Sequence, residues 1–134
     1  MPEQNYFSTL NTAYFLDSSD NIISLELLIS APGQTSTSVV SLDDIMITEL
    51  PLKGDVLLPL KSNKQLNQVT MRITTIVTDT SRESNHTGVI VKLSGGLIEK
   101  EIPLQEEVAQ EGDSVVYSII IRFKQFIPIV NHIS

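Results

Sequence analysis

The sequence contains no cysteine, and this absence removes several kinds of chemistry at once. Disulfide bonds, zinc–thiolate sites, iron–sulfur clusters and cysteine nucleophiles all need that side chain. Tryptophan is absent too, and only three tyrosines and four phenylalanines are present. Sugar-binding β-sheets usually offer aromatic platforms, whose large flat faces pack against the ligand. A carbohydrate site therefore has little support.

Basic residues are few and scattered. The chain has nine Lys and Arg against sixteen Asp and Glu, which gives a net charge of −7. Nucleic acids are bound mainly through clustered Lys and Arg, so we expect no nucleic-acid partner. No window approaches about eighteen continuous apolar residues, so we expect no membrane span. Residues 1–20 show no basic segment followed by an apolar run, so the default location is the cytoplasm, with signal-independent export left open.

The residues that are abundant favour β-structure. Isoleucine, valine and threonine make up 38 of 134 residues, whereas alanine, the best helix former, occurs only three times. The length suits one domain over residues 1–134, with an apolar C-terminal tail at 126–134. We predict a single-domain, antiparallel β-sandwich with a jelly-roll or immunoglobulin-like topology.

Turn residues divide the chain into about eight expected strands, with 44–50 as a further candidate. Pro59 cannot donate to a ladder, so its strand belongs at a sheet edge or a bulge. One short helix is expected over 104–111, because Leu104 and Val108 share a helical face and Gly112 suits its C-terminal cap. The strands are expected at 6–16, 22–30, 35–42, 54–60, 68–80, 87–94, 97–104 and 115–126.

The polar stretch between the strands 68–80 and 87–94 is the one place that resembles chemistry. It holds Asp79, Glu83 and His86, which raises the alternative of a divalent metal site. Such sites need several ligands in fixed geometry, and no established metal-binding pattern surrounds these three residues. We therefore expect the mobile tip of a β-hairpin, without a metal or another cofactor.

Enzyme templates lack their parts. The two histidines lie at this expected tip and near the C-terminus, where neither is set up as an oriented base. Asp43 and Asp44 are adjacent, as are Glu106 and Glu107, and neighbours on a strand point to opposite faces. No glycine-rich phosphate loop is present. We expect a protein without catalytic activity.

A short motif near the C-terminus adds to the sandwich prediction. Asp113, Tyr117 and Ile119 have the spacing of a carboxylate, a strand tyrosine and the apolar position two residues later. This arrangement resembles the tyrosine corner of immunoglobulin-like sandwiches, with Ile119 where antibody domains have cysteine. The resemblance implies a fold and says nothing about function.

The outward faces of the expected strands suggest an interaction surface. If the central hairpin and the last strand share a sheet, isoleucines and basic residues form one outer face, while 99–113 is strongly acidic. Such patches suit head-to-tail association, and the apolar tail offers a further contact. We expect an interaction or assembly protein that forms homo-oligomers or docks into a larger complex; the alternative is a small sandwich that binds carbohydrate or calcium. The expected interface residues are Arg72, Ile76, Ile90, Lys92, Ile120, Arg122, Phe126 and Ile129.

Overall fold

The computed structural model describes residues 5–30, 33–80 and 85–126. These residues form strands and one short helix. The elements are β1 (Asn5–Leu16), β2 (Ile22–Ile29), β3 (Gln34–Leu42), β4 (Ile45–Met46), β5 (Leu52–Lys53), β6 (Val56–Ser62), α1 (Asn63–Leu66), β7 (Thr70–Asp79), β8 (His86–Ser94), β9 (Lys100–Glu107) and β10 (Ser114–Gln125).

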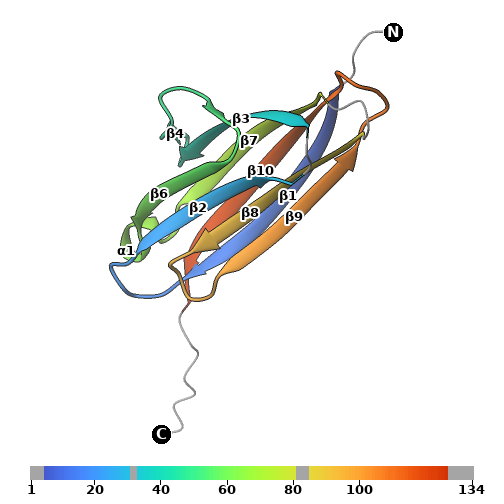
Figure 1. Cartoon of the computed structure of the whole chain (residues 1–134). Helices are drawn as coiled ribbons and strands as arrows, with labels where there is room; N and C mark the ends of the chain where they lie inside the picture. Colours follow the sequence, from blue (N-terminus) through green and yellow to red (C-terminus); the bar gives the residue numbers. More distant parts are fainter. Residues whose placement is uncertain (1–4, 31–32, 81–84, 127–134) are drawn as a thin grey trace, which may run out of the picture.

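Two sheets pack face to face and confirm the predicted all-β sandwich (Figure 1). Sheet A is six-stranded, with the order β1-β10-β7-β3-β4 and β5 paired with β3. Sheet B is four-stranded, with the order β6-β2-β8-β9. The pair β1–β10 is parallel, so sheet A is mixed rather than purely antiparallel. This strand order does not by itself identify a jelly roll or an immunoglobulin-like topology.

The core lies between the sheets and follows the period-two alternation of the strands. Five alternate residues of β10 face it, and each is 0% exposed: Val115, Tyr117, Ile119, Ile121 and Phe123. Their partners on β7 include Ile73, opposite Ile119, and Val77, opposite Val115. Sheet B contributes Ile23, Leu25 and Leu27 from β2, with Val89, Val91 and Leu93 from β8. The predicted buried faces of the strands are confirmed.

The prediction that the strands 68–80 and 87–94 form a central hairpin is wrong. β7 pairs with β10 and β3 in sheet A, whereas β8 pairs with β2 and β9 in sheet B. The chain thus crosses from one sheet to the other between Asp79 and His86. The alternation that predicted two paired strands fits this crossing equally well, because both strands still bury one face in the shared core.

The helix lies elsewhere than expected. The segment expected as a helix over 104–111 begins as strand, since β9 continues to Glu107 in register with β8. A two-turn helix is marginal alone, and the ladder to β8 satisfies the same backbone groups. The helix α1 begins instead after Ser62, whose side chain accepts a hydrogen bond from the Gln65 backbone in a capping box.

Two smaller expectations concern Pro59 and the tyrosine corner. Pro59 lies on β6, an edge strand of sheet B, next to a register shift in β2 between Ile22 and Ser24, so its predicted place is confirmed. Tyr117 does not form a tyrosine corner, because its hydroxyl group lies 2.7 Å from Thr87 Oγ1 on the opposite sheet. It joins the two layers through their core.

Candidate functional site

The structure brings together four of the eight expected interface residues. Arg72 and Ile76 lie on β7, and Ile120 and Arg122 lie on the neighbouring strand β10. Ile120 is directly opposite Arg72 in the ladder, and all four side chains alternate with buried residues. They share the outer face of sheet A.

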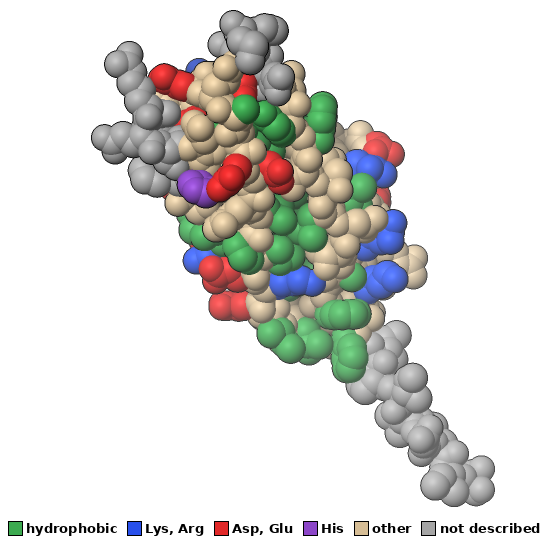
Figure 2. Space-filling view, turned by 90° about the vertical axis from the view of Figure 1, so that its right-hand side faces the viewer, with side chains coloured by type: hydrophobic (Ala, Val, Ile, Leu, Met, Phe, Trp, Pro, Cys, Tyr) green, Lys and Arg blue, Asp and Glu red, His purple; other side chains and the backbone are tan. Residues whose placement is uncertain are grey.

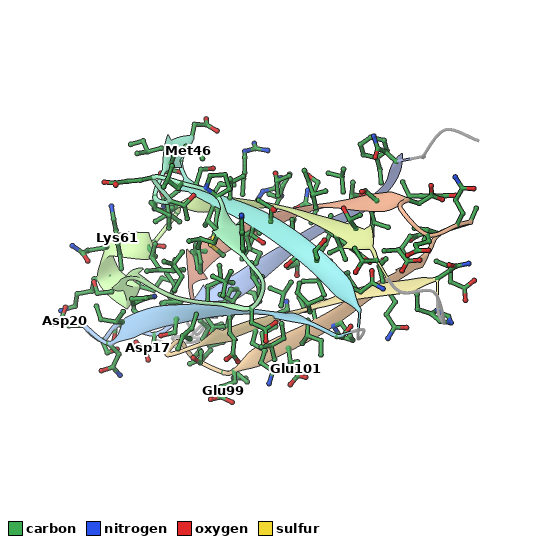
Figure 3. The ribbon with its side chains drawn as sticks, turned by 45° about the horizontal axis from the view of Figure 1, so that its top comes forward. Asp17, Asp20, Met46, Lys61, Glu99 and Glu101 are labelled. Atoms are coloured by element: carbon green, nitrogen blue, oxygen red, sulfur yellow. The ribbon has the colours of Figure 1, made fainter. Side chains whose placement is uncertain are left out.

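The other expected residues lie elsewhere. Ile90 and Lys92 belong to β8, on the outer face of sheet B, because β7 and β8 are in different sheets. The single patch expected from the sequence is therefore wrong. Figure 3 shows the two opposite surfaces, with Met46 at the end of β4 on one side and Glu99 and Glu101 on the other. Ile129 lies outside the described residues.

A row of apolar side chains crosses the outer face of sheet A. Phe7 pairs with Val116, and Val116 pairs with Ile76, so the three residues stand side by side on β1, β10 and β7. Phe7 is 74% exposed and Ile76 is 43% exposed. Phe7 could not be predicted as part of this row from the sequence, because the period-two pattern does not reveal that β1 lies beside β10.

The charges near this row are exposed and mostly basic. Arg72 Nε lies 3.5 Å from Asp44 Oδ1, with both side chains more than half exposed. An ion pair of this kind contributes about 0–1 kcal/mol. Arg122 and Lys124 project from the far end of β10 and are also exposed. The face is thus an apolar row with basic groups toward one end.

The outer face of sheet B is different in character. Lys92 stands between Glu26 of β2 and Glu101 of β9 in the ladder. These three residues line a hollow of about 440 Å³ together with Ser24 and Ser94, among others. Lys92 is therefore flanked by carboxylates on both sides and adds no basic patch to the isoleucines of sheet A.

A second apolar cluster lies at the end of the sandwich where the chain leaves β10. The rings of Phe15 and Phe126 meet edge to face, with centroids 6.1 Å apart. Leu97 and Ile98 lie beside Phe15 around a hollow of about 150 Å³. We call these four residues the end cluster. Phe126 was expected at an interface, whereas Phe15, Leu97 and Ile98 were not. Leu97 and Ile98 directly follow the Gly95-Gly96 turn, and this position gave a signal for an exposed apolar pair.

Asp79 and His86, which the sequence offered as alternative metal ligands, lie in different surroundings. Asp79 is fully buried, and its Oδ1 accepts a hydrogen bond from Gln34 Nε2 at 3.1 Å. His86 is exposed, and its Nδ1 lies 3.2 Å from Glu107 Oε1. Glu83 lies outside the described residues, and within the described ranges no three His, Cys, Asp or Glu residues gather as metal ligands. Asp79 is thus part of the packed interior, not of an exposed tip.

Two buried tyrosines have shifted acidity. Burial raises the pKa of Tyr117 above its usual value, against the opposing effect of its hydrogen bond with Thr87. Burial likewise raises the pKa of Tyr14, whose hydroxyl group accepts a hydrogen bond from the Gly96 backbone. Both hydroxyl groups bond within the fold and help to hold its parts together.

Known proteins offer no guide to this surface. No family model, curated protein or solved structure matches the chain. No helix in the described ranges is long and apolar enough to cross a membrane. The row Phe7, Val116 and Ile76, together with Ile120 and its basic neighbours, is the candidate site on geometry alone.

Proposed function

We propose that this protein is a non-catalytic assembly protein, whose copies associate with one another through the outer face of sheet A. The observation that carries the proposal is the apolar row Phe7, Val116 and Ile76 on that face. Single exposed apolar residues are ordinary, whereas a contiguous apolar patch is typical of an interaction site. Ile120 and Met46 add apolar groups elsewhere on this face: Ile120 lies four residues beyond Val116 on β10, and Met46 is opposite Ser41, which is opposite Arg72.

The size of the apolar contribution limits how strong this association is. Fully burying one large apolar side chain contributes about 1.5–3 kcal/mol. Phe7, Ile76 and Met46 are 74%, 43% and 56% exposed, so their exposed parts supply about 3–5 kcal/mol per copy and about 5–10 kcal/mol for two copies. Bringing two molecules together costs about 4–15 kcal/mol in lost freedom and ordering. Apolar burial alone therefore gives weak association, and a stable assembly needs additional contacts.

The test is the molar mass of the protein by light scattering over a concentration series. The wild-type mass should rise above that of one chain as the concentration increases, and Ile76→Lys should reduce the rise. The added lysine brings the net charge of −7 closer to zero, so a lower mass in this variant does not come from greater overall repulsion.

Leu57→Lys is the matched control. Leu57 is 71% exposed and lies on the edge strand of sheet B, so the same charge is added far from the proposed surface. Its mass should follow that of the wild type. A wild-type protein that stays a single chain at millimolar concentration would contradict the proposal, as would equal losses in the two variants.

A further inference from the structure

Three of the four sheet edges carry features that prevent strands from adding to them. An unpaired edge strand exposes a row of N–H and C=O groups, and proline, charge or shortness blocks it. β4 and β5, which both pair with the outer side of β3, span only two residues each. β6 contains Pro59 and Lys61. β9 contains Pro103 and four charged residues, namely Lys100, Glu101, Glu106 and Glu107.

The fourth edge, β1, has none of these features. It spans 12 residues, NYFSTLNTAYFL, without a charged residue, a proline or a glycine. Within residues 5–30, 33–80 and 85–126, its only strand partner is β10. A long, uncharged edge of this kind is the form that accepts another strand.

The backbone of β1 shows which residues would make the new hydrogen bonds. The carbonyl of Ala13 accepts from Lys100 Nζ at 2.9 Å, and that of Phe15 accepts from the Leu97 backbone at 3.1 Å. Both acceptors point away from β10, and the backbone N–H and C=O groups of successive residues in a strand point alternately to its two lateral edges. The N–H and C=O groups of Phe7, Thr9 and Asn11 therefore face the open edge.

The side of the sandwich at this edge is also apolar. Figure 2 looks onto the side where β1 and β9 lie and shows hydrophobic side chains gathered in its middle. Tyr6 and Leu10 of β1 and Ile102 and Leu104 of β9 are only partly buried where they pack against the core. A strand added beside β1 would cover them.

The charges along β1 favour a second copy of the chain as the occupant. At the Ala13–Phe15 end of β1, the basic residues Lys100, Arg122 and Lys124 outnumber the nearby carboxylates of Asp17 and Glu99. At the other end, the Ala109 backbone donates to the Tyr6 hydroxyl group, and the acidic neighbours of Ala109 in sequence are Glu106, Glu107 and Glu111. Two antiparallel copies of β1 place each basic end beside the partner's acidic end.

We propose that β1 of one copy pairs antiparallel with β1 of a second copy about a twofold axis near Thr9, which joins the two A sheets into one. This inference rests on the proposed self-association and adds to the outer-face contact a second contact, at the edge of the sheet. The association becomes isologous, not head-to-tail as the sequence suggested. The two rows of Phe7, Val116 and Ile76 then lie on one continuous face.

A cysteine scan tests the pairing directly, because the natural chain has no cysteine. Single cysteines at residues 7 to 11 should give a disulfide-linked dimer under mild oxidation only at the position on the axis. Two residues away, the paired positions are about 13 Å apart along the strand, given about 3.3 Å per residue. A disulfide needs Cα atoms within about 7 Å, so the yield should fall sharply there.

Cysteines at Ser118 and Thr74 are the matched controls. Both stand in the same cross-strand row as Thr9, one and two strands inside the sheet. A dimer linked only through these inner positions overturns the edge pairing and leaves face-to-face association standing. An associating wild-type protein without a cross-link anywhere also overturns the pairing. A wild-type protein that stays a single chain removes both proposals.

Thr9→Pro gives a second, independent reading. The Thr9 N–H faces the open edge, so proline removes a donor to the partner and leaves the ladder with β10 in place. The variant should keep the far-UV circular dichroism spectrum of the wild type and lose its dimer in light scattering. A folded Thr9→Pro protein with the mass of the wild-type dimer refutes the pairing.

Discussion

Ile119 and Ile120 are neighbours on β10 with opposite surroundings, and replacing each by alanine tests the assignment of the two faces. Ile119 is fully buried between the sheets, opposite Ile73 of β7 and beside Leu10 of β1. Ile120 is half-buried on the outer face, opposite Arg72. The same atoms are removed in both variants, so any difference between them comes from position.

The expected magnitudes differ clearly. Ile119→Ala removes core contacts and leaves a cavity, which costs about 2–5 kcal/mol of unfolding free energy. With an unfolding entropy of about 2.1 cal/mol/K per residue, this loss lowers Tm by about 7–18 °C for a chain of this length. Ile120→Ala leaves no closed cavity and should cost about 1 kcal/mol or less in the isolated monomer.

Urea unfolding at low protein concentration measures both values without a contribution from association. Because the chain has no tryptophan, far-UV circular dichroism is the suitable probe. Equal slopes with urea in the two variants would show that the midpoints report stability alone. If Ile120→Ala costs more than Ile119→Ala in the monomer, the assignment of inner and outer faces is refuted.

Three further predictions concern the hydrogen bond between the sheets, its dependence on pH, and the C-terminal end of the chain. Thr87→Val should lower the free energy of unfolding in urea by about 1–3 kcal/mol, because it leaves the buried Tyr117 hydroxyl group without its partner. Tyr117→Phe should cost only about 1 kcal/mol, because Thr87 Oγ1 still donates to the Glu106 carbonyl. Burial raises the pKa of Tyr117 in the folded protein, so its contribution to the free energy of unfolding is present below about pH 10 and is lost as the pH rises further. Above about pH 10, Tyr117→Phe should therefore lose less stability with rising pH than the wild type. A chain that ends at Lys124 lacks Phe126 and the apolar residues after it, and its mass should fall below that of the full chain at equal concentration; a loss of stability with unchanged mass would place this segment on its own domain.

The buried face of each strand could be predicted from the sequence because it depends on nearest neighbours alone. In β7, the alternation of Met71, Ile73 and Val77 with polar residues selects one face whatever lies beside the strand. The same reasoning placed Pro59 at an edge, since a missing N–H cannot serve a central ladder. These local rules hold before the sheets are known.

Sheet membership could not be predicted in the same way. Ile90 and Lys92 alternate with buried valines as the sequence indicated, yet they face the opposite side of the molecule from Ile76. A short polar connection suits a hairpin and a crossing between sheets equally. The choice depends on which distant strands offer a ladder, and here β10 and β3 pair with β7.

Two other features did carry signals in the sequence. Ser62 and Gln65, which lie between two expected strands, have the spacing of a capping box, and this spacing marks the start of α1. The uncharged run from Asn5 to Leu16 is equally plain, but its meaning depends on the position of the strand. Such a run is ordinary in the middle of a sheet, but at an edge it exposes N–H and C=O groups that can pair with another strand.

Net charge sets a condition that any self-association must meet. At −7 per chain, two copies repel each other at long range, and added apolar contact does not remove that repulsion. The repulsion weakens where opposite charges meet, and the basic groups Arg122 and Lys124 lie at one end of β10 while the acidic segment from Glu106 to Glu111 lies near the other. A parallel, side-by-side arrangement would set like ends together. An antiparallel arrangement sets unlike ends together twice, which is why the direction of pairing follows from the charges as well as from the uncharged edge of β1.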